Sequence, residues 1–426
     1  MGYKNSGIEW IGDIPDDWIV SKLKYNLTEP MKYGATETGV EYQEDLCRYI
    51  RITDITGKGQ LKEEGMLSLT DAQANGYILK DKSVLFARSG GTVGKSFLYK
   101  KEMGKAAFAG YLISANADQQ KMLPEWLMYF TDSFSYNEWT NAIFTQATIQ
   151  NIGADKYSNM EIPIAPIDIQ RRIINFLDKK CSDIDKLIRD IDTQIEVLEK
   201  YKQSVISEVV TKGLINNRDM KESGIDWVGE IPSSWTVMPN KYVMHKEKTI
   251  CPIYNGEDIL SLTMNGVIIR DLEAGGKMPA SFNGYQVLHA GNLLMCLFDI
   301  DVTPRCIGYI KNEGLSSPAY SQFVMHENAN AEYYYYYYLM VDYTKELLHM
   351  AKNLRHSLTE DQLGAIPVPV PPIDEQVEIA NYLNKKVNAI DAIIAEKKEQ
   401  LGIVEQYRKI VVYEYITGKK EVPANA

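Results

Sequence analysis

The feature that most constrains this chain is an internal repeat, in which two distant segments carry nearly the same thirteen residues. Residues 6–18 read SGIEWIGDIPDDW and residues 223–235 read SGIDWVGEIPSSW, and we call these segments the heads. Eight of the thirteen positions are identical, and three more exchange Glu with Asp or Ile with Val. Because chance does not produce such agreement, the fold must accommodate two copies of one unit.

A second pair of matching segments, the tails, follows in a different register. PIDIQRRIINFLDKKCSDIDKLI from Pro166 matches PIDEQVEIANYLNKKVNAIDAII from Pro372, and extending this register to Thr211 gives 18 identities in 46 positions. The heads start 217 residues apart, at 6 and 223, whereas the tails start 206 residues apart, at 166 and 372. The middle region is therefore 11 residues shorter in the second copy, and the two middles share only scattered resemblance. This layout indicates a duplicated frame that carries two different inserts.

Both tails have the periodicity of long helices. Seam residues recur in alternating steps of four and three over four heptads, which is typical of a coiled coil. The residues expected along this seam are Leu177, Ile184, Ile188, Ile191, Ile195, Leu198 and Lys202 in the first tail, and Leu383, Ile390, Ile394, Leu401, Val404 and Arg408 in the second. The alternative interpretation is that the tails are two core helices of a globular domain. A helix of about 43 residues would span roughly 65 Å, however, which exceeds the usual length of such helices.

Two polar features recur in the tails. Lys202 and Arg408 occupy the same seam position, where a polar side chain can set the register of the pair. At the start of each tail, Asp168 and Asp374 stand where a helix N-cap is expected.

We therefore expect an α+β protein with two α/β domains in tandem, separated by two long helices packed as an antiparallel coiled coil with pseudo-twofold symmetry. Such pairing would place the two variable regions at opposite ends. The expected ranges are 1–165 for the first domain with its head, 166–215 for the first long helix, 216–371 for the second domain and 372–420 for the second long helix.

The middle regions mix short strand-like runs with turns rich in Gly. Arg48–Ile52 and Ser83–Ala87 read as strands in the first, and similar runs begin at Ile259 and Asn292 in the second. The six consecutive tyrosines Tyr333–Tyr338 suggest base stacking, but six adjacent residues point all round a helix. Packing in the core is the favoured interpretation for most of them.

Basic and amide side chains in the middle regions are candidates for contact with nucleic acid. The net charge of −11 argues against simple adhesion to phosphates, so any such contact must be local. Two segments shortly before the tails, TQATIQN from Thr145 and KNLRHS from Lys352, are rich in groups that pair with base edges. Taken singly, each residue is also explained as an ordinary solvated surface or loop residue. The candidates are Arg48, Arg51, Arg88, Lys95, Lys105, Gln146, Thr148, Gln150, Arg270, Lys277, Arg305, Lys352, Asn353 and Arg355.

Motifs for catalysis, metal binding or membrane insertion are missing from the sequence. SGGTVGKS from Ser89 lacks the first glycine of a nucleotide-binding P-loop at the required spacing. The five histidines have no metal-site spacing, and the five cysteines are scattered, which fits a reducing cytoplasm. The cofactor and target-base loops of an amino-methyltransferase are absent. No apolar stretch could span a bilayer, and the N-terminus does not read as a secretory signal.

The sequence resembles one known family, the specificity subunits of type I restriction–modification systems. The resemblance covers nearly the whole chain. It rests on both heads, on YIRITDI, VLFARSGGTVGKS and AGYLISAN in the first middle region, on ILSLTMNGVIIRD, GYQVLHAGNLL and SSPAYSQF in the second, and on the Pro-Ile-Asp turns that lead into both tails.

The resemblance implies two target-recognition domains, each gripping half of a split and asymmetric DNA target, with the helical pair setting the gap between the halves. It implies a subunit that does no chemistry and binds double-stranded DNA and two adenine-N6 methyltransferase (modification) subunits. The complex can also recruit restriction subunits, which are ATP-driven translocase–nucleases. S-adenosylmethionine, ATP and Mg²⁺ would then be bound by the partners, with no cofactor on this chain.

Two alternatives remain open at this point. The first is a non-enzymatic coiled-coil scaffold whose duplicated domains bind protein. The second, a self-contained DNA methyltransferase, is disfavoured by the missing motifs.

Overall fold

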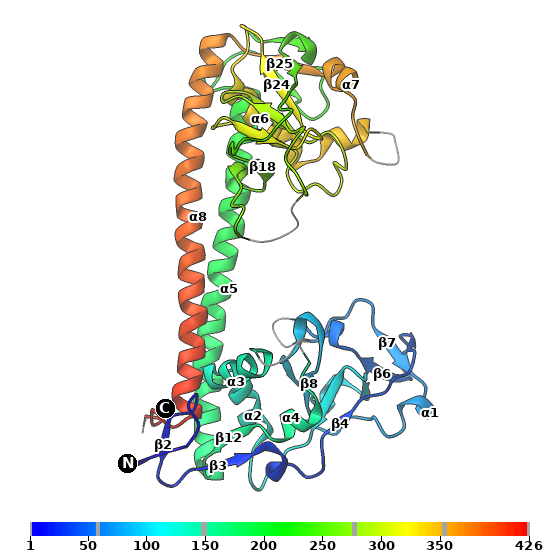
Figure 1. Cartoon of the computed structure of the whole chain (residues 1–426), viewed down its shortest axis with the longest axis vertical. Helices are drawn as coiled ribbons and strands as arrows, with labels where there is room; N and C mark the ends of the chain where they lie inside the picture. Colours follow the sequence, from blue (N-terminus) through cyan, green and yellow to red (C-terminus); the bar gives the residue numbers. More distant parts are fainter. Residues whose placement is uncertain (1, 57–59, 146–150, 275–278, 352–355, 424–426) are drawn as a thin grey trace. The chain divides into compact units, whose positions relative to one another are not determined.

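The computed structural model describes residues 2–423 except for 57–59, 146–150, 275–278 and 352–355. Contacts divide the chain into two compact units, the first formed by Met1–Asp192 and Glu399–Ala426 and the second by Thr193–Lys398. Two long helices, α5 (Ile167–Lys212) and α8 (Ile373–Ile416), pass from one unit to the other. Each unit therefore combines the start of one long helix with the end of the other (Figure 1).

The prediction of two long helices is confirmed, with 46 residues in α5 and 44 in α8. The predicted seam is the covered side of each helix, because its residues are buried or half-buried while most of their neighbours are exposed. The fully buried members are Leu177, Ile184, Ile191, Ile195, Leu383, Ile390 and Ile394; the half-buried ones are Ile188, Leu198, Lys202, Leu401, Val404 and Arg408.

Within each unit the two helical segments run antiparallel. In the first unit the ring of Phe176 lies 4.6 Å from that of Tyr415, and further along α5 Asp185 accepts a hydrogen bond from Arg408. In the second unit Glu199 pairs with Lys398 at 3.5 Å, and Lys202 with Asp391 at 2.6 Å. In both cases the residue number rises on α5 as it falls on α8, as the sequence predicts.

The predicted N-caps are wrong by two residues. Helix α5 begins at Ile167, and the backbone N–H of Gln170 donates to the carbonyl of Pro166, so Pro166 is the residue that precedes the helix. Asp168 lies inside the first turn, and Asp374 has the same place in α8. An acidic side chain in the first turn interacts favourably with the positive end of the helix dipole even when it caps no backbone N–H. Asp is therefore still a suitable residue there.

The rest of the first unit is an α+β domain with its head. Its strands are β1 (Tyr3–Asn5), β2 (Asp13–Pro15), β3 (Ile19–Lys22), β4 (Lys32–Tyr33), β5 (Val40–Glu41), β6 (Cys47–Ile50), β7 (Leu67–Leu69), β8 (Val84–Ala87), β9 (Ser96–Leu98), β10 (Ala106–Phe108), β11 (Leu112–Ala115) and β12 (Glu161–Ile164). Its helices are α1 (Asp71–Ala74), α2 (Pro124–Thr131), α3 (Phe134–Thr145) and α4 (Ala154–Ser158), and its 3-10 turns are η1 (Leu23–Asn26), η2 (Ile52–Asp54), η3 (Gly90–Thr92) and η4 (Lys101–Met103).

The second unit contains a domain of the same class. Its strands are β13 (Met220–Glu222), β14 (Glu230–Pro232), β15 (Thr236–Pro239), β16 (Met244–Glu247), β17 (Thr249–Ile250), β18 (Leu260–Thr263), β19 (Gly266–Ile269), β20 (Gln286–Leu288), β21 (Leu293–Met295), β22 (Ile307–Tyr309), β23 (Gly314–Ser316), β24 (Ser321–Met325) and β25 (Pro367–Val370). Its helices are α6 (Ala331–Tyr343) and α7 (Glu360–Ala365), and its 3-10 turns are η5 (Asn240–Tyr242) and η6 (Glu346–Met350).

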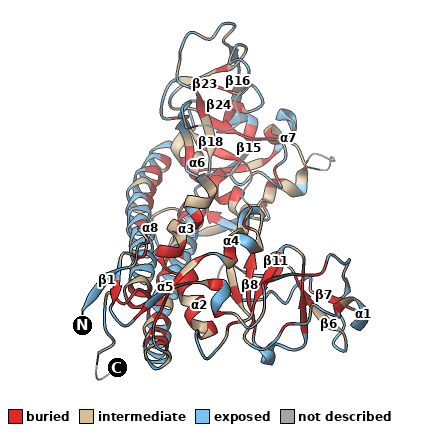
Figure 2. Cartoon of the chain, turned by 60° about the horizontal axis from the view of Figure 1, so that its bottom comes forward, coloured by how far each residue is buried: buried red, intermediate tan, exposed pale blue. Residues whose placement is uncertain are grey.

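The two domains share a central sheet and differ beside it. The central sheet has the order β4-β11-β8-β9 in the first unit and the equivalent order β16-β24-β21-β22 in the second, with β8 and β11 buried along their whole length (Figure 2). The smaller pairs also correspond, since β1-β2 and β3-β12 match β13-β14 and β15-β25. Beside the central sheet the first unit has a second sheet of order β10-β6-β7-β5, whereas the second unit has the separate sheets β17-β20-β23 and β18-β19. The inserts therefore diverge in this outer layer.

The tyrosine run packs in the core, as predicted. All of Tyr333–Tyr338 lie on α6, and every one except the half-buried Tyr335 is buried. The hydroxyl of Tyr336 donates to Asn384 of α8 at 2.8 Å, and that of Tyr333 donates to the carbonyl of Val210 of α5 at 2.9 Å. These tyrosines attach the domain to both long helices.

In the described part of the chain, no helix combines the length and the apolar character that a membrane span requires.

Candidate nucleic-acid interface and helical frame

The clearest nucleic-acid candidate in the first unit is Arg88, which directly follows the central strand β8. Its guanidinium carbon lies 4.9 Å from the centre of the Tyr33 ring, and its Nε is buried without a hydrogen-bond partner among the described residues. Its backbone N–H donates to the carbonyl of Tyr111, whose side chain is 63% exposed. An arginine beside an exposed aromatic ring can stack on bases and donate to their edges, so this arrangement suits contact with DNA.

A close backbone approach places Tyr33 beside Arg88. A Cβ atom at the following residue, Gly34, would lie 2.3 Å from the carbonyl oxygen of Phe108, so only glycine allows β4 to pass there. The Tyr33 hydroxyl is fixed in turn by the backbone N–H of Ala154, which donates to it at 2.9 Å. The ring is therefore held at the surface from both sides.

The first predicted base-reading segment ends at this cluster. Asn151 forms an antiparallel bridge with Ser89, and the next residue, Ile152, donates its N–H to the carbonyl of Arg88 at 2.9 Å. The side-chain oxygen of Asn151 is buried without a partner among the described residues. We call Tyr33, Arg88, Tyr111 and Asn151 the Arg88 cluster. Three of the predicted contact residues, Gln146, Thr148 and Gln150, lie outside the described residues.

The second predicted segment ends at the equivalent place in the second unit. The N–H of Leu358 donates to the carbonyl of Leu297, just beyond β21, at 2.8 Å, which repeats the bond between Ile152 and Arg88. Here His356 lies 2.9 Å from Asp301, and its hydrogen bond lowers the pKa of that carboxyl. The chemistry at the strand end thus differs between the units, although the attachment is the same. Lys277, Lys352, Asn353 and Arg355 lie outside the described residues.

The remaining predicted basic residues have varied surroundings. Arg51 forms an ion pair with Asp54 at 2.7 Å, and Arg48 donates to the carbonyl of Lys62 at 2.5 Å, so both guanidinium groups have partners within the chain. Lys105 pairs with Asp71 at 2.6 Å at the surface. Of the other three residues, Lys95 is exposed, and Arg270 and Arg305 are half-buried. The roles of these six residues remain predictions.

The helical frame carries a feature that the sequence reasoning missed, an apolar surface present in both units. In the first unit it consists of Leu187 on α5 and of Ile403 and Tyr407 on α8; in the second it consists of Ile393 on α8 and of Val197 and Tyr201 on α5. Each residue lies 206 positions from its counterpart, and all six side chains are between 44% and 59% exposed. We call this set the repeated apolar surface. Exposed apolar groups that recur at equivalent positions of both units make these positions candidates for a binding surface used twice.

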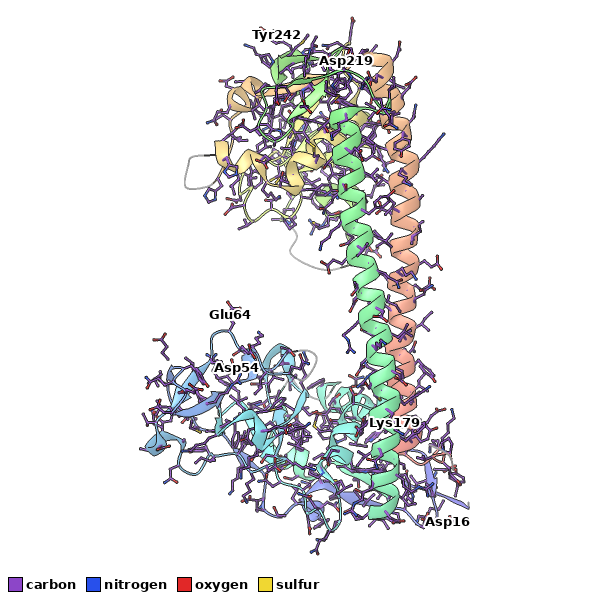
Figure 3. All side chains as sticks on the ribbon, turned by 180° about the vertical axis from the view of Figure 1, so that it is seen from behind. Asp16, Asp54, Glu64, Lys179, Asp219 and Tyr242 are labelled. Carbon is purple, nitrogen blue, oxygen red and sulfur yellow. The ribbon has the colours of Figure 1, made fainter. Side chains whose placement is uncertain are left out.

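The segments just after the heads show a second repeated surface feature. Tyr25 and Tyr242, 217 residues apart, are 61% and 57% exposed, and each ring lies under the ammonium group of the preceding lysine. Figure 3 labels Tyr242 at the edge of the second unit. The repeat register could have identified both surface features, because the paired residues are alike in sequence. What the sequence does not show is that these side chains are exposed while the seam residues beside them are covered.

Nothing in the geometry of the described residues points to chemistry by this chain. Those residues include no group of three or more His, Cys, Asp or Glu side chains that could hold a metal ion. Burial raises the pKa of the Cys181 thiol to about 11 and that of Cys306 to about 12, so neither is a ready nucleophile. The arrangement can bind and position other molecules.

Comparisons with known proteins agree with this geometry. Residues 30–197 and 297–402 match the family described as the type I restriction modification DNA specificity domain. A Methanocaldococcus jannaschii protein named for the specificity subunit of the type I restriction enzyme MjaX is 26% identical over 97% of this chain and 96% of its own length. The MjaVIII specificity subunit of the same organism is 25% identical over 81% and 80%. Among solved structures, a chain from a study of complex assembly and conformational transition in the type I R-M system has the same fold, with a TM-score of 0.70, 14% identity and coverage of 96% and 99%.

Proposed function

This chain belongs to the type I restriction modification DNA specificity family, and from this premise we propose that it is the sequence-reading subunit of such a system. Each unit reads one half of a split DNA target. The shared central sheet and the divergent outer layer support two related domains that read different sequences. The target is then asymmetric.

In this proposal the observation that carries DNA reading is the Arg88 cluster together with its counterpart in the second unit. Both candidate reading segments attach at the end of the same central strand, through the N–H of Ile152 in one unit and of Leu358 in the other. Different side chains at one structural position are what two half-sites of different sequence require.

We further propose that two copies of one protein partner, an adenine-N6 methyltransferase subunit, bind the repeated apolar surface. Support comes from the repeat itself, since each unit has three exposed apolar side chains at equivalent positions. The partners would bring S-adenosylmethionine, and restriction subunits with ATP and Mg²⁺ could join them, while this chain binds no cofactor and catalyses nothing. The complex would act on DNA in the cytoplasm.

The negative charge of the chain fits a complex in which the partner supplies part of the DNA-binding surface. A net charge of −11 is unfavourable for holding phosphates, so positive surface on the partner would complete the grip on DNA. We therefore expect weak DNA binding by the isolated chain and tight, selective binding by the complex.

The decisive experiment enriches random duplexes with the chain alone and with the chain bound to its methyltransferase partner, at one fixed salt concentration. The expected result is a two-part motif that appears only with the complex, and methylated adenines in cells expressing both proteins should fall within that motif. Equal affinity and selectivity with and without the partner would contradict the proposal that the partner contributes to DNA binding. A complex that enriches no motif would favour the protein scaffold instead.

A further inference from the structure

Two equivalent tryptophans in the heads have different hydrogen-bonding states. Trp18 and Trp235 lie 217 residues apart and are both buried, with exposed fractions of 2% and 0%. The indole N–H of Trp235 donates to a carboxylate oxygen of Glu375 at 2.8 Å. Arg218 pairs with the other oxygen of Glu375, and its guanidinium carbon lies 5.3 Å from the centre of the Trp235 ring. In the second unit a carboxylate therefore satisfies the indole N–H and is itself neutralised.

The first unit lacks this carboxylate. In the tail register of 206 residues, Glu375 corresponds to Ile169, which cannot accept a hydrogen bond. The indole nitrogen of Trp18 is accordingly buried without a partner among the described residues. An unsatisfied buried donor costs free energy that a matching acceptor would recover.

A pocket lies next to this indole ring. Trp18 and Ile169 both line it, together with the apolar side chains of Ile173 and Val422 and the cations Arg172 and Lys420. Its volume is about 60 Å³, which is enough for a carboxylate group. The pocket thus borders the ring that carries the unsatisfied N–H, and it offers positive charge and an apolar wall. In the second unit Glu375 likewise contacts an indole N–H and a guanidinium group.

We propose that this pocket of the first unit binds a carboxylate group from outside its own core, in the way that Glu375 fills the equivalent place in the second unit. The apolar wall suits the methylene arm of an acidic side chain, and the indole N–H and Arg172 suit its charged end. Two sources share this chemistry: an acidic side chain of a protein partner, and Glu421 of this chain, which also lines the pocket. Either one makes the frame asymmetric, because in the second unit Glu375 of the second tail already contacts the equivalent indole N–H.

The test follows the six tryptophan indole N–H signals of the full-length ¹⁵N-labelled chain by NMR while acetate is added. The Trp18 signal, assigned with Trp18→Phe, should shift and saturate, whereas those of Trp10 and Trp235 should not. Trp10 is the matched control, because its indole nitrogen is also buried without a partner among the described residues but does not line the pocket. Arg172→Gln should weaken acetate binding by about fivefold to tenfold.

A transplant from the second unit gives a second readout. Ile169→Glu should place a carboxylate beside the indole, so that the Trp18 signal is shifted without acetate and no longer responds to it. Ile169→Gln, of similar size but uncharged, should still leave a weak acetate response.

Glu421→Gln distinguishes the two sources. If the wild-type chain is insensitive to acetate and Glu421→Gln becomes sensitive, the pocket binds a carboxylate and Glu421 supplies it. If the wild-type chain responds, the site is open to an incoming acidic group. The proposal is overturned if neither chain responds, or if Trp10 and Trp18 shift together without saturation. This test needs no DNA and no methyltransferase, so its failure would leave the proposed function untouched.

Discussion

The Lys202 ammonium group lies 2.6 Å from a carboxylate oxygen of Asp391 on the neighbouring long helix. The same ion pair recurs in the first unit, where Arg408 donates to Asp185 at 2.7 Å. Arg408 lies 206 positions after Lys202, and Asp391 lies 206 positions after Asp185. One difference separates the two sites, because Arg408 also pairs with Asp132, the residue after α2. The duplicated frame thus keeps one ion pair in each unit and adds a link to the recognition domain in the first.

Replacing the two basic residues should therefore have unequal effects on stability. Lys202→Met removes one pair whose Asp391 side chain is 50% exposed, so the free energy of unfolding should fall by about 1 kcal/mol or less. Arg408→Met leaves two carboxylates without their cation, and the loss should be about 1–3 kcal/mol. Burial opposes the charge of Arg408, but Asp132 and Asp185 outweigh it and raise its pKa, so the residue is charged at any working pH.

Chemical unfolding of the two variants and of Asp132→Asn checks this prediction. Asp132→Asn should recover part of the loss when combined with Arg408→Met, because it removes one uncompensated charge. Equal losses for Lys202→Met and Arg408→Met would show that the contact with Asp132 contributes nothing.

The Arg88 cluster predicts an effect confined to one half of the DNA target. Arg88→Ala in the methyltransferase complex should relax selectivity in the half-site read by the first unit by about 1–3 kcal/mol, roughly fivefold to 150-fold in affinity. Enrichment of random duplexes by the variant complex measures the base selectivity in both half-sites in one experiment. Lys100→Ala, which removes a surface ammonium group 3.8 Å from Glu102 and is not among the predicted contact residues, should change neither half. A uniform loss across both halves would instead assign Arg88 to phosphate contact or to folding.

Periodicity explains what could be predicted of this fold from the sequence. A seam repeated every three and four residues determines which side of a helix is covered, and for Leu177 and Leu383 the burial agrees. The tyrosine run was predictable for a similar reason, since adjacent residues cannot all face solvent. The start of α5 was misplaced because Asp168 is a good residue both at an N-cap and in a first turn, and the pattern alone does not separate the two.

The site was less predictable because its residues meet through strand pairing. Tyr33 and Arg88 are 55 positions apart, and they come together only because β4 and β8 both pair with β11. Gly34 lets the chain after β4 lie against the backbone of Phe108. A glycine in a sequence does not reveal which backbone segment will lie against it. The difference between Ile169 and Glu375 was visible in the aligned tails, but its meaning required the position of the indole nitrogen.

Acid should weaken the first unit through Glu29. Hydrogen bonds from Lys32 and Lys80 lower the pKa of this carboxyl from 4.5 to about 2 in the folded chain. Because the folded pKa is depressed, the stabilisation is complete above pH 4.5 and is lost as the pH falls toward 2. Glu29→Gln should remove about 1 kcal/mol at neutral pH and flatten the dependence over this window.

Urea unfolding at a series of pH values measures this contribution. Glu102→Gln is the matched control, because its side chain is 78% exposed and lies 3.8 Å from its lysine partner. The two variants should differ above pH 4.5 and converge as the pH approaches 2. A Glu29→Gln profile parallel to the wild-type profile would argue against a role for this carboxylate.

The repeated apolar surface predicts the number of bound partners. Tyr201→Ala and Tyr407→Ala should each leave a complex with one methyltransferase subunit, and the double variant should bind none tightly, because each tyrosine belongs to one of two equivalent surfaces. Native mass spectrometry gives the stoichiometry directly. Tyr382→Ala is the control, since Tyr382 is exposed on α8 but its counterpart, Phe176, packs against Tyr415. Loss of both partners from a single variant would mean that the two surfaces do not act independently.

Lengthening the long helices should change the gap between half-sites while leaving the half-sites themselves unchanged. One heptad inserted after Thr193 in α5 and one after Glu399 in α8, where the chain passes between the units, preserves the seam and adds about 10 Å of helix. At about 3.4 Å per base pair, the recognised gap should widen by roughly three base pairs. Mapping methylated adenines in cells that express the variant with its partner reads out both the gap and the half-sites. Four-residue insertions at the same places shift the seam off the covered face, so they should destabilise the chain instead of widening the gap. Altered half-site sequences in the heptad variant would show that the helices shape recognition as well as spacing.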